Sequence, residues 1–224
     1  MLIRHRVYLI SAGLVAVLVA IGATAPNRFR DVAEATLNTL GHYFGWFYLI
    51  STFVFVIFLL ALAMSRYGKI RLGPQDCKPD YGVFSWLSML LSAGFGVGLV
   101  FYGMAEPIQH LMEPPHGQAE PGSTAAASLA MQYSFFHWGV SQWAAFSLVG
   151  LIIAFFQFRK DRPGLVSTMV EPVTKNLPKR QLISDSLDVL AVLATVMGVA
   201  TSLGLGVLQM NGGLETVFGW PDNL

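Results

Sequence analysis

Three glycines stand at alternate positions in an apolar stretch of this sequence. Gly94, Gly96 and Gly98 fall in the run SAGFGVG that begins at Ser92, and each glycine weakens a helix interior by about 0.8–1 kcal/mol relative to alanine. One interpretation is close packing, because Gly94 and Gly98 have the Gly-x-x-x-Gly spacing on which a second helix can approach. The other is an unwound segment whose free carbonyl oxygens meet an ion or a substrate, as in the discontinuous helices of carriers. The spacing alone leaves both interpretations open.

Aromatic side chains supply a second candidate chemistry. Trp138, Trp143 and Phe146 lie in another apolar stretch, and at ~100° per residue a continuous helix would turn them onto one broad face. Such a surface attracts a cation through the ring quadrupole without a buried carboxylate. The position of Trp138 near the end of the stretch is also typical of a side chain that anchors a helix at the membrane interface, whereas Trp143 lies nearer the middle of the predicted span. We interpret His137 as a hydrogen-bonded helix residue rather than as a proton relay.

The elements that carry these residues are long uncharged segments. The chain has 224 residues, of which 54% are hydrophobic and 12% charged, about half the charged fraction of a soluble domain. Five gaps between charged residues exceed the roughly 20 residues that a helix needs to cross the hydrocarbon layer. We therefore predict an all-α, polytopic transmembrane helical bundle that forms a single membrane domain. The five spans are approximately Val7–Ala25, Phe44–Met64, Phe84–Ala105, Ser134–Gln157 and Leu187–Met210.

The first span and the connections predict an orientation. An apolar run after Arg4 and Arg6 is also typical of a signal peptide, but its length and the spans that follow favour a membrane helix. Lys and Arg are concentrated at the amino terminus, which has two, in the second connection, which has four, and in the fourth, which has six. By the positive-inside rule, the amino terminus is cytoplasmic and the chain emerges outside after the fifth span. Within the fourth connection, we expect Leu165–Val173 to form a short helix at the membrane surface.

Composition also limits the class of function. A formal net charge of +1 provides no basic field for nucleic acid. The single cysteine, Cys77, cannot form an internal disulfide, and it has no Cys or His neighbour at metal-ligand spacing. The sequence therefore predicts neither a disulfide framework nor a zinc site, and it identifies no metal ligands. A membrane-embedded enzyme needs a nucleophile–base pair or metal ligands inside the bilayer, and the spans contain only His137 and scattered hydroxyls. A structural or assembly subunit without transport activity is an alternative, although it leaves the glycine run and Trp143 without a purpose.

Three segments, taken together, resemble the betaine/choline/carnitine transporter family. They are AGFGVGLVFYGMAEP from Ala93, FHWGV from Phe136 together with Trp143, and ATVMGVATSLGLG from Ala194. The resemblance runs from about the second span to the end of the chain. It implies two leading helices followed by two inverted repeats of five helices each, with the third helix of the chain broken at the glycines. On this pattern the chain stops after the third helix of the first repeat, so we expect an amino-terminal, incomplete portion of a secondary transporter.

The resemblance also implies substrate-binding positions. They are Gly94, Gly96, Gly98, Trp138, Trp143 and Phe146. Phe146 stands where some betaine carriers have Tyr, and it keeps the ring but loses the hydroxyl. Members that carry choline often have Asp where this chain has Gly98, and the predicted spans contain a single acidic residue, Asp188 at the beginning of the fifth. A zwitterion with its own carboxylate is therefore the better electrostatic fit, which favours glycine betaine or a similar compatible solute, with choline or carnitine left open.

The same resemblance implies ion coupling. Ser92 and Phe95 fall where backbone carbonyls help to hold sodium in sodium-coupled members, and Thr195 matches a hydroxyl of a sodium site. Val199, however, replaces a second Thr of those members, which favours proton coupling or a reduced sodium requirement. We expect no cofactor other than a sodium ion or proton. The expected partners are a small quaternary-ammonium substrate and the lipid bilayer of the cytoplasmic membrane, and the sequence is compatible with a homo-oligomer.

Overall fold

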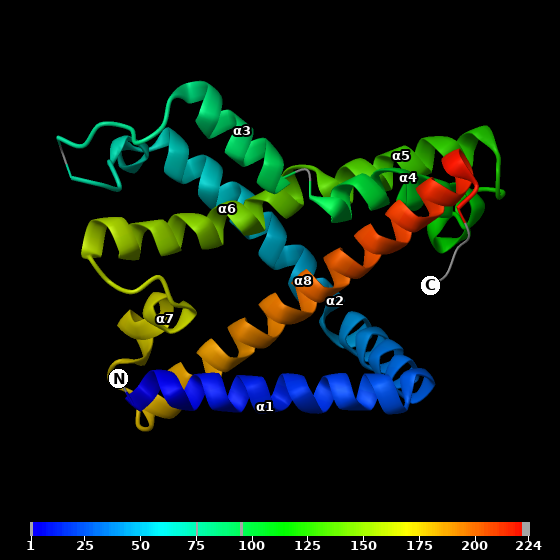
Figure 1. The fold of residues 1–224 in the computed structure, drawn as a ribbon. Coiled ribbons are helices and arrows are strands. Elements are labelled where there is room, and N and C mark those ends of the chain that lie inside the picture. The colour runs from blue at the N-terminus through cyan, green and yellow to red at the C-terminus, as the bar shows by residue number, and fades with distance from the viewer. Residues whose placement is uncertain (1, 75, 95, 221–224) are drawn as a thin grey trace. The chain divides into compact units, whose positions relative to one another are not determined.

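The computed structural model describes residues 2–74, 76–94 and 96–220, and the regular structure in these ranges is helical. The predicted all-α class is therefore confirmed. In chain order the helices are α1 (Leu2–Thr24), α2 (Pro26–Met64), η1 (Arg66–Lys69), α3 (Val83–Gly94), α4 (Val97–Met112), η2 (Pro115–Gly117), α5 (Thr124–Trp138), α6 (Val140–Ala154), the π-helical η3 (Phe155–Arg159), α7 (Val166–Thr174) and α8 (Arg180–Phe218) (Figure 1).

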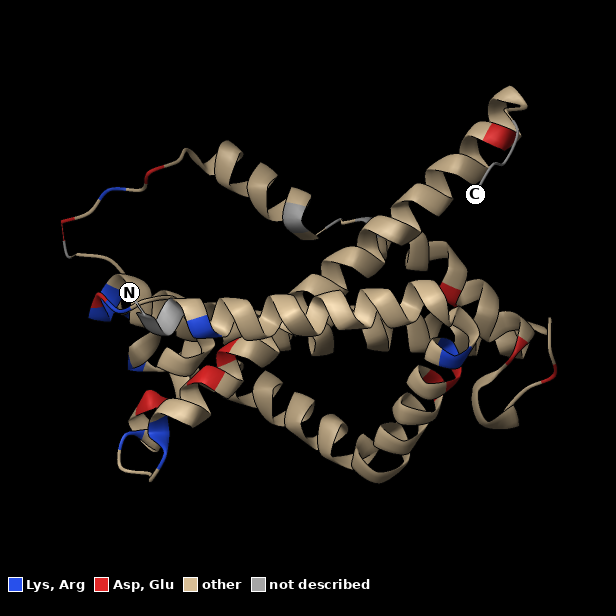
Figure 2. Ribbon diagram, turned by 60° about the horizontal axis from the view of Figure 1, so that its bottom comes forward, with Lys and Arg blue, Asp and Glu red and all other residues tan. Residues whose placement is uncertain are grey.

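Within the described residues, four helical stretches are long and apolar enough to cross a membrane. They are His5–Thr24, Pro26–Met64, Thr124–Arg159 and Arg180–Phe218. Large apolar side chains of α2, such as Trp46, Phe53 and Leu60, are exposed, as expected of surfaces that face lipid or other membrane helices. Figure 2 shows Lys, Arg, Asp and Glu gathered near helix ends and in connections, with most of each long helix uncharged.

The third predicted span, Phe84–Ala105, is divided between two shorter helices. The helix α3 ends at Gly94, and α4 begins at Val97. The other four predicted spans lie in α1, in the second part of α2, across α5, α6 and η3, and in α8.

The chain forms two compact units. One consists of Met1–Gln75 and Ala144–Val196, and the other of Asp76–Trp143 and Met197–Leu224. In the second unit, α4 and α5 pack against each other more extensively than any other pair of described helices. Of the predicted site residues, this helix pair contains Gly98 and Trp138.

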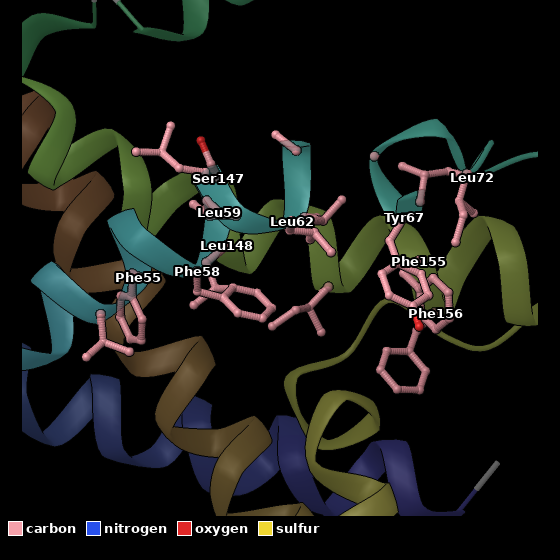
Figure 3. A pocket seen from close by; sticks show the side chains of 17 residues that line it. Phe55, Phe58, Leu59, Leu62, Tyr67, Leu72, Ser147, Leu148, Phe155 and Phe156 are labelled. Carbon is pink, nitrogen blue, oxygen red and sulfur yellow. The ribbon is translucent and has the colours of Figure 1, made fainter. Parts of the chain in front are cut away.

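An apolar cavity of about 970 Å³ lies within the first unit, between α2 with η1 and α6 with η3. Figure 3 shows aromatic and aliphatic side chains around it, including Phe58, Leu148 and Phe156. Arg66 donates a hydrogen bond of 3.0 Å to the hydroxyl of Tyr67, one of the lining residues. Because the lining offers few polar groups to orient a small polar solute, the cavity does not have the character of a substrate site.

Candidate functional site

The glycine run interrupts the helix, as predicted. Gly96 has an extended conformation, with φ −61° and ψ 169°, and it is the N-cap residue of α4. Its carbonyl oxygen accepts hydrogen bonds from the N–H groups of Leu99 at 3.0 Å and Val100 at 3.2 Å. Gly94 and Gly98 therefore belong to different helices and do not form the single helical face that the Gly-x-x-x-Gly interpretation requires.

The glycines on the two sides of the break have different surroundings. A Cβ atom built on Gly94 would lie 3.0 Å from Cη2 of Trp143, so the absence of a side chain allows the indole to approach the end of α3. A Cβ atom on Gly98 would meet no described atom within 4 Å. Close packing thus explains Gly94, whereas the space beside Gly98 is open.

A second interruption, which the sequence analysis did not predict, lies at Gly139. The helix α5 ends at Trp138, Gly139 has φ −87° and ψ −145°, and α6 begins at Val140. A Cβ atom at position 139 would collide with the carbonyl oxygen of Phe135. The expectation that Trp138 and Trp143 share one face of a continuous helix was wrong, because the helix is broken between them.

Trp138 is held between α4 and α5. Its indole stacks on the ring of Tyr102, with a centroid distance of 5.8 Å and an interplanar angle of 27°. Its Nε1–H donates a hydrogen bond to Oε2 of Glu106. Trp138 therefore has both its ring face and its only polar atom engaged by residues of α4.

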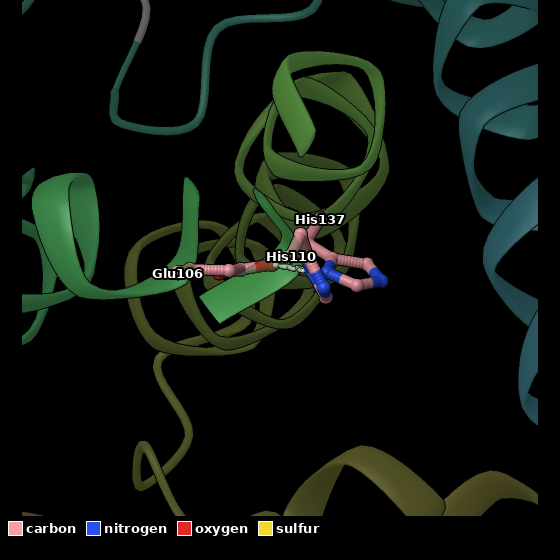
Figure 4. Close-up of side chains that lie close together, drawn as sticks. All are labelled: Glu106, His110 and His137. Carbon is pink, nitrogen blue, oxygen red and sulfur yellow. Dashed lines mark hydrogen bonds and ion pairs between the residues drawn. The ribbon is translucent and has the colours of Figure 1, made fainter. Parts of the chain in front are cut away.

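Glu106 is the centre of this network (Figure 4). Its Oε1 faces Nδ1 of His137 and, at 3.3 Å, Nε2 of His110. The side chain of Glu106 is only 12% exposed, and burial of a carboxylate is tolerated where several donors surround it. The expectation that His137 is a hydrogen-bonded helix residue is confirmed.

The same three residues also form a set of metal-binding atoms. A carboxylate oxygen of Glu106 and one ring nitrogen each of His110 and His137 lie within 4.8 Å of one another, and zinc and iron accept such donors. The contacts with Trp138 and with both imidazoles already account for the position of the carboxylate. The geometry therefore supports first of all a role in fixing α4 against α5.

The remaining predicted residues are divided between the two units of the chain. Phe146 is exposed on α6, and Ser92 is exposed in the last turn of α3. The hydroxyl of Thr195 donates a hydrogen bond of 2.8 Å to the carbonyl oxygen of Ala191, one turn earlier in α8, and Phe95 lies outside the described residues. Ser92 belongs to one unit and Thr195 to the other, so the ion site stays a prediction.

Sequence reasoning missed Glu106 and His110 as site residues. One signal was available, because Glu106 directly follows the third predicted span and precedes His110 by one helical turn, a spacing at which side chains meet. The contact with Trp138 joins residues 32 positions apart. This contact depends on the packing of α4 against α5, so the spacing of residues along the sequence does not predict it.

These observations define the class of protein: a multi-pass helical membrane protein with a helix broken beside aromatic side chains, an arrangement that carriers use. Comparison with known families agrees, because residues 6–224 match the BCCT, betaine/carnitine/choline family transporter. The chain belongs to this family, whose members are transporters rather than enzymes.

Individual relatives have related activities in their names. The chain is 54% identical over 222 residues to the ectoine/hydroxyectoine transporter of Virgibacillus pantothenticus, covering 99% of the chain and 44% of that protein. It is 44% identical to the glycine betaine transporter OpuD of Bacillus subtilis (strain 168), covering 99% and 43%. It is 34% identical to the high-affinity choline transport protein of Escherichia coli (strain K12), covering 99% and 32%. The chain thus spans less than half the length of these relatives.

Proposed function

We propose that the full-length protein containing this sequence carries a small quaternary-ammonium or related zwitterionic compatible solute across the cytoplasmic membrane by ion-coupled secondary transport. The observation that carries the proposal is the break between Gly94 and Val97, with the indole of Trp143 in contact with Gly94. Broken helices supply free backbone groups near a substrate, and an indole face binds a cationic head group.

Charge supports a zwitterionic substrate. The described parts of the predicted spans contain one carboxylate, that of Asp188 at the beginning of the fifth span, and it accepts hydrogen bonds from Ser167. Glu106, just beyond the third span, is engaged by Trp138 and two histidines. A substrate that carries its own carboxylate needs no compensating acid from the protein. Glycine betaine fits this requirement, and the identity of 54% to an ectoine/hydroxyectoine transporter makes ectoine, another zwitterion, the second candidate.

For the coupling ion we propose a proton, or sodium with a reduced requirement. The support is twofold: Val199 offers no hydroxyl one turn after Thr195, and the hydroxyl of Thr195 bonds to its own helix. Ser92 and Phe95 are retained as proposed carbonyl ligands of sodium. Uptake that depends steeply on sodium and not on a pH gradient would overturn the proton alternative.

Transport assays test the proposal directly. Labelled glycine betaine, ectoine and choline would be offered to cells that lack their own uptake of these solutes and express the full-length protein, with and without sodium. We expect saturable uptake of betaine or ectoine in preference to choline. Uptake of none of the three would contradict the proposal.

A matched pair of variants addresses the aromatic site. Trp143→Leu keeps an apolar side chain but removes the ring quadrupole, and it should weaken substrate affinity roughly thirtyfold, since a desolvated cation–π contact contributes about 2 kcal/mol. Trp143→Phe should retain more of the affinity. If both variants bind substrate like the parent, Trp143 has only a packing role.

A further inference from the structure

A small polar cavity lies between α7 and the beginning of α8, away from the proposed substrate site. Its volume is about 230 Å³. The helix α7 and the part of α8 up to Val196 belong to one unit of the chain. The lining residues are Ser167, Thr168, Glu171, Thr174, Lys175, Arg180, Gln181 and Ser184.

The cavity lies between two helices that are tied together at one end. Asp188 of α8 accepts hydrogen bonds from the N–H of Ser167 at 3.0 Å and from its hydroxyl at 2.7 Å. Leu165, the N-cap residue of α7, has no side-chain acceptor, so Asp188 satisfies an N–H of the first turn in its place. The polar face of α7 is thereby held opposite the first turns of α8.

Two cations line the cavity without a carboxylate partner among the described residues. Lys175 and Arg180 form no ion pair there, whereas Glu171, the acidic lining residue, is paired with Arg162. Arg180 is also the first residue of α8, and the N–H groups at the beginning of this 39-residue helix add partial positive charge. The electrostatic character of the cavity therefore favours an anion.

The side chain of Thr168 independently indicates a ligand. Thr168 is only 7% exposed, it lines the cavity, and its hydroxyl has no hydrogen-bond partner among the described residues. The one fully enclosed side-chain oxygen without a partner among those residues is Oγ of Ser11, so the hydroxyl of Thr168 is reachable from the cavity. Hydroxyls of buried side chains are usually hydrogen-bonded within the protein. Its neighbour Thr174 follows this rule by donating to the carbonyl oxygen of Val170 at 3.1 Å.

We propose that this cavity binds a phosphate group, either that of an anionic phospholipid headgroup or that of a free phosphate ion. A tetrahedral oxyanion offers acceptors in several directions at once, which suits an ammonium, a guanidinium, a hydroxyl and a helix N-terminus arranged around one space. The lining residues belong to the connection between the fourth and fifth predicted spans. The orientation predicted above puts this connection on the cytoplasmic side, where anionic headgroups attract basic residues beside the membrane. The proposal does not depend on which solute is transported.

Thermal unfolding of the purified full-length protein in a neutral detergent tests the site. Phosphatidylglycerol, phosphatidylcholine and sodium phosphate would be titrated separately at constant ionic strength, because a ligand of the folded state raises Tm in a saturable way. We expect phosphatidylglycerol to raise Tm and phosphatidylcholine to have little effect. A saturable effect of sodium phosphate without one of phosphatidylglycerol would identify the free ion as the source, and no effect of either would overturn the proposal.

Three variants make the test specific. Lys175→Gln and Thr168→Val should each weaken the ligand roughly tenfold, as expected for one hydrogen bond to a charged group. Lys179→Gln is the matched control, because Lys179 carries the same charge next to Arg180 but does not line the cavity. Arg180→Gln provides a second cation variant if Lys175→Gln does not fold. If Lys179→Gln weakens ligand binding as much as the cavity variants do, the ligand is attracted by general surface charge and the proposal is overturned. Unchanged affinity in both Thr168→Val and the cation variants would also overturn it.

Discussion

The open space beside Gly98 makes this position a test of substrate choice. Betaine and choline share a trimethylammonium group, but betaine also carries a carboxylate where choline carries a hydroxyl. Gly98→Asp should repel the betaine carboxylate and compensate the charge of choline, since unit charges ~5 Å apart interact by about 3 kcal/mol at an effective dielectric constant near 20. In competition uptake assays, the ratio of choline affinity to betaine affinity should then rise by up to roughly a hundredfold, less the cost of desolvating the new carboxylate.

Gly98→Ala is the control for this substitution. A Cβ atom at position 98 meets no described atom within 4 Å, so Ala should leave both uptake and substrate preference near those of the parent. An unchanged preference in a folded Gly98→Asp variant would remove Gly98 from the site. Equal loss of all substrates in both variants would instead support helix packing.

Glu106 provides the second prediction for individual residues. Glu106→Gln removes the charge from both contacts, and because one carboxylate oxygen becomes an NH₂ group, either Trp138 or the histidine pair also loses its acceptor atom. We expect a loss of about 2 kcal/mol in unfolding free energy, the range of hydrogen bonds to charged groups. Trp138→Phe should cost less in the Glu106→Gln background than in the parent, a coupling that a double-mutant cycle of unfolding measurements would detect.

The exposed Glu113 at the end of α4 provides the comparison. Glu113→Gln should change unfolding free energy by no more than about 0.5 kcal/mol. Strictly additive effects of Glu106→Gln and Trp138→Phe would show that the contact does not stabilise the packing of α4 against α5.

Sequence reasoning identified residue types more successfully than residue pairs. The glycine run predicted a break in the third span because glycine weakens helices locally, and the break is observed between Gly94 and Val97. The network around Glu106 was not predicted, since it joins residues of two helices. Which carboxylate meets which indole is decided by tertiary packing.

At the scale of helices, the break at Gly139 was also missed. One glycine within an apolar helix is usually tolerated, so sequence provided no reason to divide the fourth span. The structure provides a steric reason, because a side chain at 139 would collide with the carbonyl oxygen of Phe135. On the two sides of this break the indoles have different neighbours, since Trp138 stacks on Tyr102 and Trp143 approaches Gly94.

Gly139→Ala should therefore be destabilising. Relief of the collision requires a change of backbone conformation at the junction of α5 and α6, and we expect a cost of about 1–3 kcal/mol, typical of overpacking. Gly150→Ala is a matched control in α6, where a Cβ atom meets nothing described within 4 Å and alanine favours the helix. Thermal unfolding should show a lowered Tm for Gly139→Ala only, and equal Tm values would contradict the steric explanation.

At the scale of the whole chain, length and charge determined most of what could be predicted. The absence of charge over long stretches indicated membrane helices, since a charged side chain is costly in the bilayer, and the chain belongs to a family of membrane transporters. The arrangement of the helices does not follow from such patterns. Every apolar helix face can be accommodated by lipid, so hydrophobicity does not specify which helices contact each other. Those contacts are determined by small residues and by hydrogen bonds between helices.

The orientation in the membrane is the last prediction, and Cys77 is a natural reporter for it. Cys77 is exposed and lies in the second connection, which four basic residues mark as cytoplasmic. A membrane-impermeant maleimide should label Cys77 in inside-out vesicles and not in intact cells, with any other cysteine of the full-length protein replaced. In a Cys77→Ser background, Gln118→Cys in the third connection should show the opposite pattern, because that connection has no Lys or Arg. Labelling of both positions from the same side would contradict a crossing by α3 and α4, and reversed labelling of both would contradict a cytoplasmic amino terminus.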